Sequence, residues 1–472
     1  MSNTTQALSR IEAILDDSSF VEIGAAVTAR ATDFNMQEKK APSDGVITGY
    51  GVINGNLVYV YSQDAAVLGG TIGEMHAKKI ANLYEKAMKM GAPVIGLIDC
   101  AGLRLQEATD ALDGFGQIYK NMSLASGIVP QITAVYGECG GGLAVLAELS
   151  DFVFVEEKKA KLFVNSPNAL DGNYESKLDT SSAEFMAKAG VADFIGDEET
   201  IANGVRQLVS MLPSNNEEGA VYTDNQDDLN RVCADMSAEI ADAALALTDI
   251  SDDGLFVEVK EMVTGFIQLD GVTVGAVANR TAIYDENGEK AEEFAAVLTT
   301  DGAYKAAEFV TFCNAFEIPV LSLTNVKGFE ANVRAEKTIA KAAAKLVYAF
   351  SNADVPKVNV ITGEAYGSAY VAMNSKSVGA DMVYAWSQAS IGMMDASLAA
   401  KIMYADEIAA ADDVTAKINE KASEYAALQS SVEQAAARGY VDTIINPEDT
   451  RKYIIAAFEM LFDKREVRAD KK

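Results

Sequence analysis

The chain has 472 residues with a formal net charge of −30, and 49% of its residues are apolar. One compact core rarely serves a chain of this length, so two domains are expected, and the acidity argues against binding to a nucleic-acid backbone. A single histidine and four widely spaced cysteines without a C-x-x-C pair exclude a histidine-rich metal site and a zinc ribbon, so no metal is expected in this chain.

The first segment, MSNTTQALSRIEAILDD, lacks the apolar core of a signal peptide, and no run of 18 apolar residues follows. We therefore expect a cytoplasmic protein that does not insert into a membrane. Further along, Ile80, Leu83, Tyr84 and Ala87 recur at the spacing of one helical face, which predicts an amphipathic helix. The later runs PVIGLID and ITAVYGE predict strands, so strands alternate with helices as in an α/β fold with βαβ units.

Two residues of this helix could be mistaken for functional ones. His76 is the only histidine, and we interpret it as a structural residue near the helix start whose ring is satisfied by hydrogen bonds. Lys89 lies in the tetrapeptide AMKM, which matches the biotinylation motif of biotin carrier domains. A carrier lysine occupies a β-hairpin turn, whereas Lys89 falls at the end of the predicted helix, so biotin is not expected on it.

The stretch GECGGGLAVLAEL, which starts at Gly137, predicts a strand, a glycine-rich turn and a helix. Such a turn leaves backbone N–H groups free at a helix N-terminus, where they and the helix dipole favour negative charge. A phosphate site would carry G-x-G-x-x-G or G-x-x-x-x-G-K-[ST], and neither motif is present. An oxyanion hole and a turn that only packs the helix onto the sheet remain as alternatives.

A second phrase of the same kind, GEAYGSAYV, starts at Gly363, 226 residues after Gly137. Pro93 and Pro319, Gly102 and Gly328, and Pro130 and Pro356 are separated by the same 226 residues, and further upstream the offset becomes 216. The chain therefore consists of two copies of one α/β domain. The first copy is expected over residues 1–215 and the second over 251–472, with a linker over 216–250. The polar stretch MLPSNNEEGAVYTDNQDD, which carries Pro and Gly and lies between the two copies, indicates this linker.

Ordered motifs over nearly the whole chain carry a family resemblance. The first half contains SDGVITGYGVINGNLVYVYSQD, GGTIGEMHAKKI, GAPVIGLIDCAGLRLQEA and PQITAVYGECGGG. The second half contains VTGFIQLDGVTVGAVANR, KAAEFVTFCNAFEIPVLSLTNVKGF, VPKVNVITGEAYGSAYVAM and RGYVDTIINPEDTR. In these motifs the chain resembles the carboxyltransferase subunits of biotin-dependent acyl-CoA carboxylases and decarboxylases, of the propionyl-CoA carboxylase β type.

The resemblance implies an α/β fold of two crotonase-like (ClpP/crotonase) domains. It also implies a role for both glycine-rich turns. In the first domain, the amides at Gly141 and Gly142 are expected to hold the thioester oxygen of an acyl-CoA as it becomes an enolate. In the second, the amides at Ser368 and Ala369 are expected to hold the urea oxygen of biotin.

Four further residues are expected from the resemblance to bind the cofactors. Gly140, Gly367 and Tyr366 border the two turns, and Arg104 matches a family arginine near the acyl-CoA. For Arg104 the residues alone leave a surface salt bridge equally open.

The resemblance implies two cofactors, a coenzyme A thioester substrate and biotin on a separate biotin carrier protein, with no metal. The nitrogen of biotin that carboxybiotin frees on releasing CO₂ can form the enolate, so no side-chain base is required. Further expected partners are a biotin carboxylase or a membrane decarboxylase subunit. The assembly is expected to be a homohexamer or a dimer, with each site shared between the first domain of one subunit and the second domain of another.

Several residues depart from the family pattern, including Leu103, Lys327, Ser368, Asp395 and Leu398. They leave three hypotheses open. The first is a carboxyltransferase of an acyl-CoA carboxylase, or the α subunit of a sodium-pumping acyl-CoA decarboxylase. The second is a non-catalytic structural subunit that pairs with an active homologue. The third is a crotonase-type hydrolase or isomerase that works without biotin.

Overall fold

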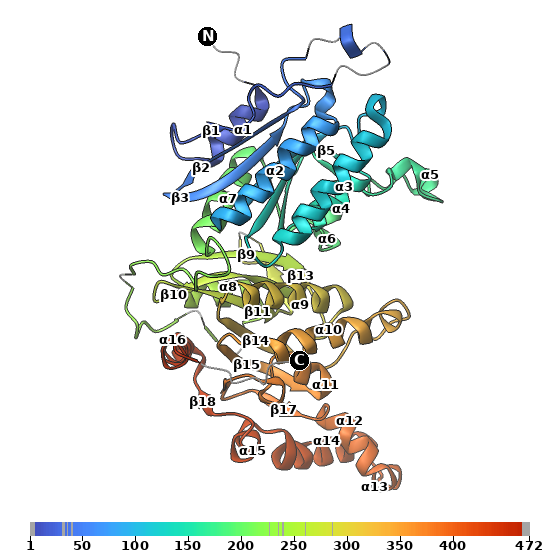
Figure 1. Cartoon of the computed structure of the whole chain (residues 1–472). Helices are drawn as coiled ribbons and strands as arrows, with labels where there is room; N and C mark the ends of the chain where they lie inside the picture. Colours follow the sequence, from blue (N-terminus) through green and yellow to red (C-terminus); the bar gives the residue numbers. More distant parts are fainter. Residues whose placement is uncertain are drawn as a thin grey trace, which may run out of the picture. The chain divides into compact units, whose positions relative to one another are not determined.

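The computed structural model describes residues 5–30, 34, 36–38, 41–225, 227–234, 236–237, 240–259, 261–285 and 287–464. The chain divides into two compact units, Met1–Val221 and Tyr222–Lys472, and each is described by itself. Figure 1 colours the first unit from blue to green and the second from yellow-green to red.

The first unit is built on one mixed sheet with the strand order β1-β2-β3-β4-β5-β6-β8, while β7 pairs with β5. Its edge is antiparallel from β1 to β3, and β3 to β8 run parallel, as βαβ connections require. The strands are β1 (Val21–Glu22), β2 (Val46–Ile53), β3 (Asn56–Gln63), β4 (Val94–Cys100), β5 (Gln131–Gly140), β6 (Phe152–Glu156), β7 (Lys161–Phe163) and β8 (Phe194–Gly196).

Helices cover this sheet, with α2 and α3 packed side by side and α1 packed with α7 (Figure 1). The helices are α1 (Gln6–Ile14), α2 (Glu74–Met90), α3 (Ala108–Ala125), α4 (Gly142–Glu148), α5 (Asn173–Ser176), α6 (Ala183–Lys188) and α7 (Glu198–Met211). Short 3₁₀ turns are η1 (Met36–Glu38), η2 (Leu68–Gly70), η3 (Leu105–Glu107) and η4 (Pro167–Ala169). The predicted amphipathic helix is α2, whose face of Ile80, Leu83, Tyr84 and Ala87 is buried.

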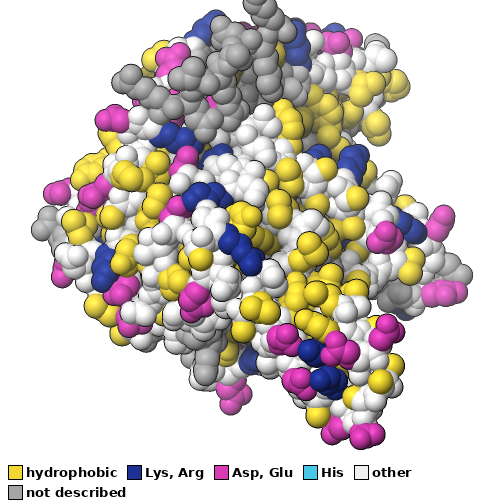
Figure 2. All heavy atoms as spheres, turned by 90° about the horizontal axis from the view of Figure 1, so that it is seen from below, with side chains coloured by type: hydrophobic (Ala, Val, Ile, Leu, Met, Phe, Trp, Pro, Cys, Tyr) yellow, Lys and Arg dark blue, Asp and Glu magenta, His cyan; other side chains and the backbone are white. Residues whose placement is uncertain are grey.

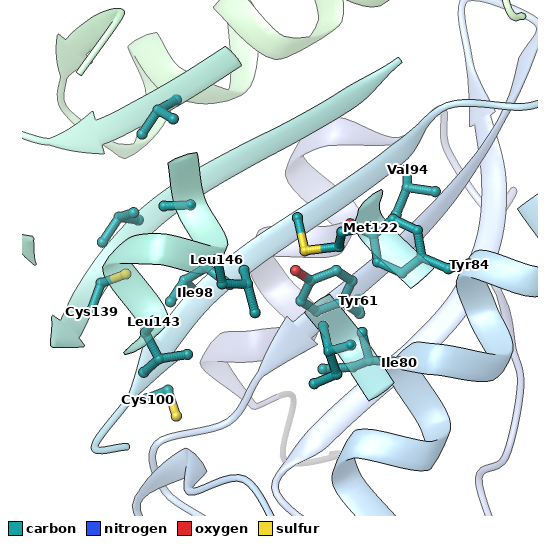
Figure 3. Close-up of a cluster of buried hydrophobic side chains, with 14 of the residues drawn as sticks. Tyr61, Ile80, Tyr84, Val94, Ile98, Cys100, Met122, Cys139, Leu143 and Leu146 are labelled. Atoms are coloured by element: carbon teal, nitrogen blue, oxygen red, sulfur yellow. The ribbon is translucent and has the colours of Figure 1, made fainter. Parts of the chain in front are cut away.

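The core of the first unit fixes the position of the short helix α4. Leu143 and Leu146 of α4 are buried in the same cluster as Ile98 of β4 and Met122 of α3 (Figure 3). Cys100 and Cys139, which are register partners on β4 and β5, complete this part of the core. Because Leu143 lies in the first turn of α4, burial of its side chain anchors the start of the helix.

The second unit repeats the topology, with the order β9-β10-β11-β14-β15-β16-β18 and with β17 on β15. A separate two-stranded sheet pairs β12 with β13. The strands are β9 (Gly254–Val259), β10 (Met262–Leu269), β11 (Val272–Asn279), β12 (Ala282–Tyr284), β13 (Lys290–Glu293), β14 (Val320–Val326), β15 (Lys357–Tyr366), β16 (Met382–Trp386), β17 (Ser390–Gly392) and β18 (Thr443–Ile445).

Among the described residues, four helices lie between β17 and β18 of the second unit, whereas two lie between β7 and β8 of the first. The helices of the second unit are α8 (Ala243–Ile250), α9 (Thr300–Ala315), α10 (Ile339–Asn352), α11 (Gly367–Ala372), α12 (Ala396–Met403), α13 (Ala405–Ala409), α14 (Val414–Tyr425), α15 (Val432–Ala437) and α16 (Thr450–Met460). Short turns are η5 (Ala335–Lys337), η6 (Lys376–Val378) and η8 (Pro447–Asp449), with a π-helical turn η7 (Ala426–Ser430). The pairs α2·α3 and α9·α10 occupy corresponding places.

The repeat extends to individual hydrogen bonds. The carboxylate of Asp151 accepts a bond of 2.8 Å from the N–H of Gln131 at the start of β5. In the second unit the carboxylate of Asp381 accepts a bond of 2.8 Å from the N–H of Lys357 at the start of β15. The α/β fold with parallel strands is confirmed, and the two sheets share one strand order.

The segment expected as a linker over residues 216–250 differs from that expectation in the structure. Its apolar residues Cys233, Met236, Leu247 and Ile250 lie in the core of the second unit. The reason is the apolar helix α8, which packs against β10 and β11. The division between the units falls after Val221, so most of this segment belongs to the second unit.

Candidate active site

A sharp turn connects the end of β5 to the start of α4. Gly141 occupies this turn with φ +65° and ψ −125°, a conformation that side chains other than hydrogen rarely permit. Its N–H donates a bond of 2.8 Å to the carbonyl of Phe163 on β7. A Cβ at the preceding Gly140 would approach the Phe163 ring to 2.7 Å, so both glycines let β7 lie close to the turn.

The amide of Gly141 is therefore committed within the fold, which differs from the donor role expected for it from the sequence. Within the described residues, no partner accepts from the N–H of Gly142 or Leu143, the first two residues of α4. The first N–H groups of a helix have no partner inside the helix, and together with the dipole they favour an anion. The free donors at this turn are those of Gly142 and Leu143.

The second unit has the same turn at the end of β15. Gly367, 226 residues after Gly141, adopts φ +61° and starts α11. Ser368 and Ala369 follow it, and no described residue accepts from their N–H groups. Ser368 is thus the counterpart of Gly142, and Ala369 is the counterpart of Leu143.

A further donor at the first turn was missed by the sequence reasoning. The carbonyl of Gly102 accepts from the N–H of Ile72 at 2.9 Å, and the N–H of Arg104 donates to the carbonyl of Ile72 at 2.9 Å. In a trans peptide the carbonyl and the next N–H point in opposite directions, so the N–H of Leu103 points away from Ile72. The bridge between Ile72 and Leu103 is parallel, like the pairing of β3 with β4, and β4 pairs on its other edge with β5, the strand that leads into α4.

The same arrangement recurs at Phe329. The carbonyl of Gly328 accepts from the N–H of Leu298 at 2.9 Å, so the N–H of Phe329 points away from Leu298 and toward the side of β15 and α11. Within the described residues the N–H groups of Leu103 and Phe329 have no partner. The equal spacing of Gly102 and Gly328 was the sequence signal that could have identified both donors.

Tyr366, expected to contact a cofactor, is almost fully buried beside the second turn. Its hydroxyl donates to Oγ of Ser390 at 2.8 Å, and that Oγ donates in turn to the carbonyl of Ser430 at 3.2 Å. Burial raises the pKa of the Tyr366 phenol. In this structure the residue ties β15 to β17, and contact with a cofactor stays a prediction.

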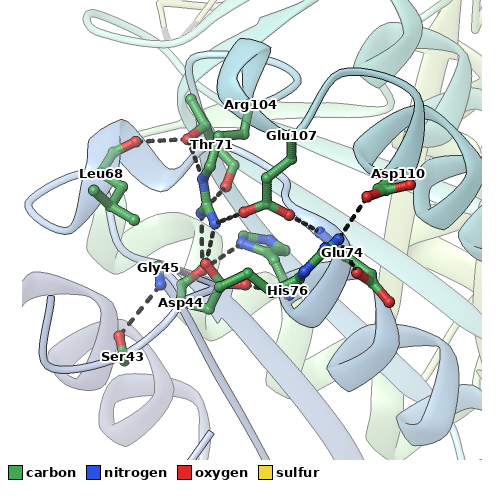
Figure 4. A network of polar contacts seen from close by, with 11 residues as sticks. Ser43, Asp44, Gly45, Leu68, Thr71, Glu74, His76, Arg104, Glu107 and Asp110 are labelled. Carbon is green, nitrogen blue, oxygen red and sulfur yellow. Dashed lines mark hydrogen bonds and ion pairs between the residues drawn. The ribbon is translucent and has the colours of Figure 1, made fainter. Parts of the chain in front are cut away.

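Arg104 lies at the centre of a buried network of polar groups (Figure 4). Its side chain is 2% exposed and forms ion pairs with Asp44 and with Glu107, the latter at 2.8 Å. It also donates to the carbonyl of Thr71 at 2.7 Å. A surface salt bridge is thereby excluded, and contact between Arg104 and an acyl-CoA stays a prediction.

His76 confirms the structural interpretation given to it from the sequence. It is the third residue of α2 and is fully buried. Its Nδ1–H donates to the carbonyl of Asp44 at 2.9 Å, which leaves Nε2 to accept from the side-chain amide of Gln63 at 3.2 Å. Burial lowers the pKa of the ring to about 3, so the imidazole is neutral at ordinary pH.

Lys89 also lies where the sequence placed it. It belongs to the last turn of α2, which ends at Met90 and is closed by Gly91 in the left-handed conformation. The next element is β4, which starts at Val94. A hairpin turn that could present a biotinylated lysine is therefore not formed by this tetrapeptide.

A cleft of about 880 Å³ opens beside Phe329 in the second unit. Its wall includes aromatic side chains and charges of both signs: Phe294, Tyr304, Phe329, Arg334, Lys337, Glu261, Asp301 and Glu330. Among the described residues no group of three or more His, Cys, Asp or Glu is arranged to hold a metal ion. Within the ranges that the structure describes, no helix has the length and hydrophobicity of a membrane span.

Comparisons with known proteins agree with these features. The sequence profile of the family described as "Carboxyl transferase domain" matches residues 2–472. The methylmalonyl-CoA decarboxylase subunit alpha of Propionigenium modestum is 39% identical over 98% of this chain and 90% of its own length. The propionyl-CoA carboxylase carboxyltransferase subunit of Haloferax mediterranei is 40% identical over 99% of this chain and 92% of its own length.

A solved structure shows the same fold. The transcarboxylase 12S subunit, determined as a hexamer with hydrolysed methylmalonyl-coenzyme A bound, superposes with a TM-score of 0.90 and 36% identity. The match covers 99% of this chain and 91% of the other. With the family profile spanning the whole fold and relatives near 40% identity, the chain belongs to the carboxyl transferase family.

Proposed function

We propose that this carboxyltransferase moves a carboxyl group between biotin on a separate carrier protein and a short-chain acyl-CoA. One observation carries the proposal: each unit presents a positive-φ glycine, a helix start with free N–H groups and an extended loop whose free N–H points to the same side. Such paired amides stabilise an oxygen that becomes negative in a transition state.

The first unit is proposed to hold the acyl-CoA. The N–H groups of Gly142, Leu143 and Leu103 are the candidate donors to the thioester oxygen, which gains charge as the enolate forms. Gly141 supplies the turn and not a hydrogen bond, because its N–H is bound to Phe163. Loss of one such donor costs about 2.7–4 kcal/mol of transition-state stabilisation in enzymes where it has been removed.

The second unit is proposed to hold biotin, in a domain that we assign to the crotonase-like class together with the first. The N–H groups of Ser368, Ala369 and Phe329 are the candidate donors to the urea oxygen. Gly367 supplies the same positive-φ turn as Gly141. The cleft beside Phe329 offers space for the arm that carries biotin.

The thiols near the first turn are unsuited to act as the base. Burial raises the pKa of Cys100 to about 11 and raises that of Cys139 further. Buried thiols of this kind are inert. His76 is enclosed and donates to a carbonyl. Biotin delivered in its carboxylated form supplies both the CO₂ and the nitrogen base, which fits a site made of backbone amides.

The protein is proposed to act as a homo-oligomer, with a homohexamer or a dimer as the assembly. An apolar patch on the face that carries α12 to α15 supports this (Figure 2). On α12 the side chains of Leu398, Ile402 and Met403 are 53%, 68% and 62% exposed, and Met393, which precedes this helix, is 75% exposed. Exposed apolar side chains that gather in this way mark interaction surfaces. We infer that each active site joins the first unit of one chain to the second unit of another.

The substrate is proposed to be propionyl-CoA or methylmalonyl-CoA, because these thioesters appear in the names of two relatives near 40% identity. Acetyl-CoA and malonyl-CoA are the alternative pair. Carboxylase and decarboxylase subunits match this chain equally well, so the direction depends on the partner, a biotin carboxylase or a membrane decarboxylase subunit.

Two of the departures from the family pattern are accommodated without loss of a candidate donor. Ser368 adds a side chain but keeps its N–H free, and Asp395 caps α12 by accepting from the N–H groups of Ser397 and Leu398. These observations favour an active carboxyltransferase over a structural subunit.

The test is carboxyl transfer by the purified chain. Methylmalonyl-CoA and malonyl-CoA are each incubated with the protein and a biotinylated carrier domain, and the decarboxylated acyl-CoA is measured by chromatography. Release of propionyl-CoA or acetyl-CoA that depends on the biotinylated carrier supports the proposal. If neither thioester turns over although both bind, the structural-subunit hypothesis is favoured instead.

A further inference from the structure

The loop that carries the Leu103 amide is held in place by the backbone and the side chain of Arg104. The backbone of Arg104 donates to the carbonyl of Ile72, and its guanidinium donates to the carbonyl of Thr71 at 2.7 Å. The N–H of Ile72 in turn fixes the carbonyl of Gly102. One residue thereby clamps the segment that sets the direction of the Leu103 N–H.

Two buried carboxylates fix the guanidinium itself. Asp44 and Glu107 are 0% and 4% exposed, and both pair with Arg104 (Figure 4). The same carboxylates cap the start of α2, where Glu107 accepts from the N–H of Glu74 at 2.7 Å and Asp44 accepts from the N–H of His76 at 2.7 Å. Every charge in the cluster therefore has a partner, as burial requires.

Gly73 packs directly against the side chains of this cluster, with no space for a Cβ atom. A Cβ at Gly73 would lie 2.4 Å from the Arg104 guanidinium and 2.5 Å from the Glu107 carboxylate. Gly73 immediately precedes α2, so the helix start, the two carboxylates and Arg104 are packed as one unit. A planar guanidinium that bridges several acceptors is the side chain suited to such a junction.

The second unit is built differently at the equivalent place. Glu330, 226 residues after Arg104, follows Phe329, and both line the open cleft. At the start of α9 a hydroxyl, that of Thr299, donates to Glu261 at 2.5 Å. The residue after Leu103 therefore carries a buried guanidinium, whereas the residue after Phe329 carries a carboxylate on the wall of the cleft.

We propose that Arg104, with Asp44 and Glu107, is a positioning residue that fixes the Leu103 amide for the enolate oxygen and does not itself bind the acyl-CoA. The proposal rests on the function proposed above for the first unit. It follows that these three residues affect only the step in which the thioester oxygen gains charge. A donor that is displaced by about 1 Å can cost about 10²-fold in rate.

The test compares Arg104→Gln, Arg104→Lys and Gly73→Ala with the wild-type protein in carboxyl transfer from a carboxylated acyl-CoA. We expect kcat of Arg104→Gln to fall about 10²-fold with little change in KM for the acyl-CoA, because a transition-state donor is displaced while ground-state binding survives. Arg104→Lys should recover part of kcat, since an ammonium can pair with only some of the acceptors. Affinity for the biotinylated carrier should not change.

Arg206→Gln is the matched control. Arg206 is a structural arginine of the same unit that binds Asp16, Asn54 and the carbonyl of Ile14, all remote from the loop. Its loss should lower the melting temperature and leave kcat unchanged. A raised KM with preserved kcat in Arg104→Gln would instead assign Arg104 to acyl-CoA binding. Unchanged kcat and KM with a lower melting temperature would reduce it to a structural residue like Arg206.

Amide hydrogen exchange separates this proposal from the function proposed above. Exchange of the segment around Leu103 should accelerate in Arg104→Gln and in Gly73→Ala, and not in Arg206→Gln, even if the wild-type protein transfers no carboxyl group. If Arg104→Gln does not fold, Gly73→Ala, which keeps all three charges, gives the same readout. Unchanged exchange in this segment overturns the positioning role.

Discussion

Gly141 and Gly367 are separated by 226 residues, and both adopt a positive φ, +65° and +61°, where a parallel strand passes into a short helix. The chain thus makes the same backbone turn twice, once in each unit. In both cases the two residues that follow carry free N–H groups within the described structure. In the function proposed here the hydrogen-bond donors to the reacting oxygens are backbone amides, and no side chain is proposed as a donor.

Substitutions at Gly142 test the first turn. Gly142→Pro removes one N–H, and we expect carboxyl transfer to fall by at least about 10²–10³-fold. A Cβ at this position would meet the Phe115 ring at 2.7 Å, so Gly142→Ala measures the cost of the added carbon alone. Steady-state kinetics of both variants should show a much larger loss for proline. Equal losses would mean that packing against Phe115, and not the amide, explains the effect.

The repeat and the α/β class could be predicted from the sequence because equal spacing of glycines and prolines survives in the chain itself. The identity of the donors could not. Gly141 was expected to donate, but Phe163 on the three-residue strand β7 binds its N–H. No local pattern announces a strand so short or shows which strand it joins.

The role of Arg104 was open for a similar reason. Its burial depends on Asp44, 60 residues earlier in the chain, and on the start of α2. The direction of the Leu103 and Phe329 amides depends on bridges to Ile72 and Leu298. Such tertiary contacts decide which backbone groups stay free, and they leave no periodic signal in the sequence.

Acid should destabilise the fold through His76. Burial holds the pKa of the ring at about 3, below the value of 6.5 that an unperturbed histidine has. As the pH falls from 6.5 toward 3, the His76 ring therefore binds a proton in the unfolded chain but not in the folded chain. Stability is retained above pH 6.5 and should fall below it, with a contribution of up to about 1.4 kcal/mol per pH unit.

Urea unfolding measured between pH 6.5 and pH 4.5 checks this expectation. The slope of unfolding free energy against pH should be smaller in His76→Gln than in the wild-type protein by roughly the contribution of one proton. Equal slopes for the two proteins would show that His76 titrates normally in the folded state.

Lys89 should stay free of biotin when the protein is produced in cells with active biotin ligase. The lysine belongs to the last turn of α2 and not to a hairpin. Intact-mass measurement should show no biotin adduct, and a biotin carrier domain expressed in the same cells serves as the positive control. A stoichiometric adduct on Lys89 would contradict the structural argument.

Sharing of the active site between chains can be tested by mixing. Gly142→Pro damages the first unit and Ala369→Pro damages the second, so each variant alone should be inactive. Oligomers assembled from both variants should regain part of the activity, because some sites then combine two intact units. If native mass spectrometry confirms mixed oligomers and no activity returns, each site lies within one chain.

The most direct measurement of the central claim is carboxyl transfer by Ser368→Pro compared with Ser368→Ala. Ser368 already carries a Cβ, so alanine keeps the N–H and the packing, whereas proline removes the N–H in the first turn of a helix, where it is tolerated. We predict that both variants bind acyl-CoA like the wild-type protein, that Ser368→Ala keeps its rate, and that Ser368→Pro loses about 10²–10³-fold in transfer from the carrier. Equal transfer rates for the two variants would contradict the claim that backbone amides of the second turn act in the reaction.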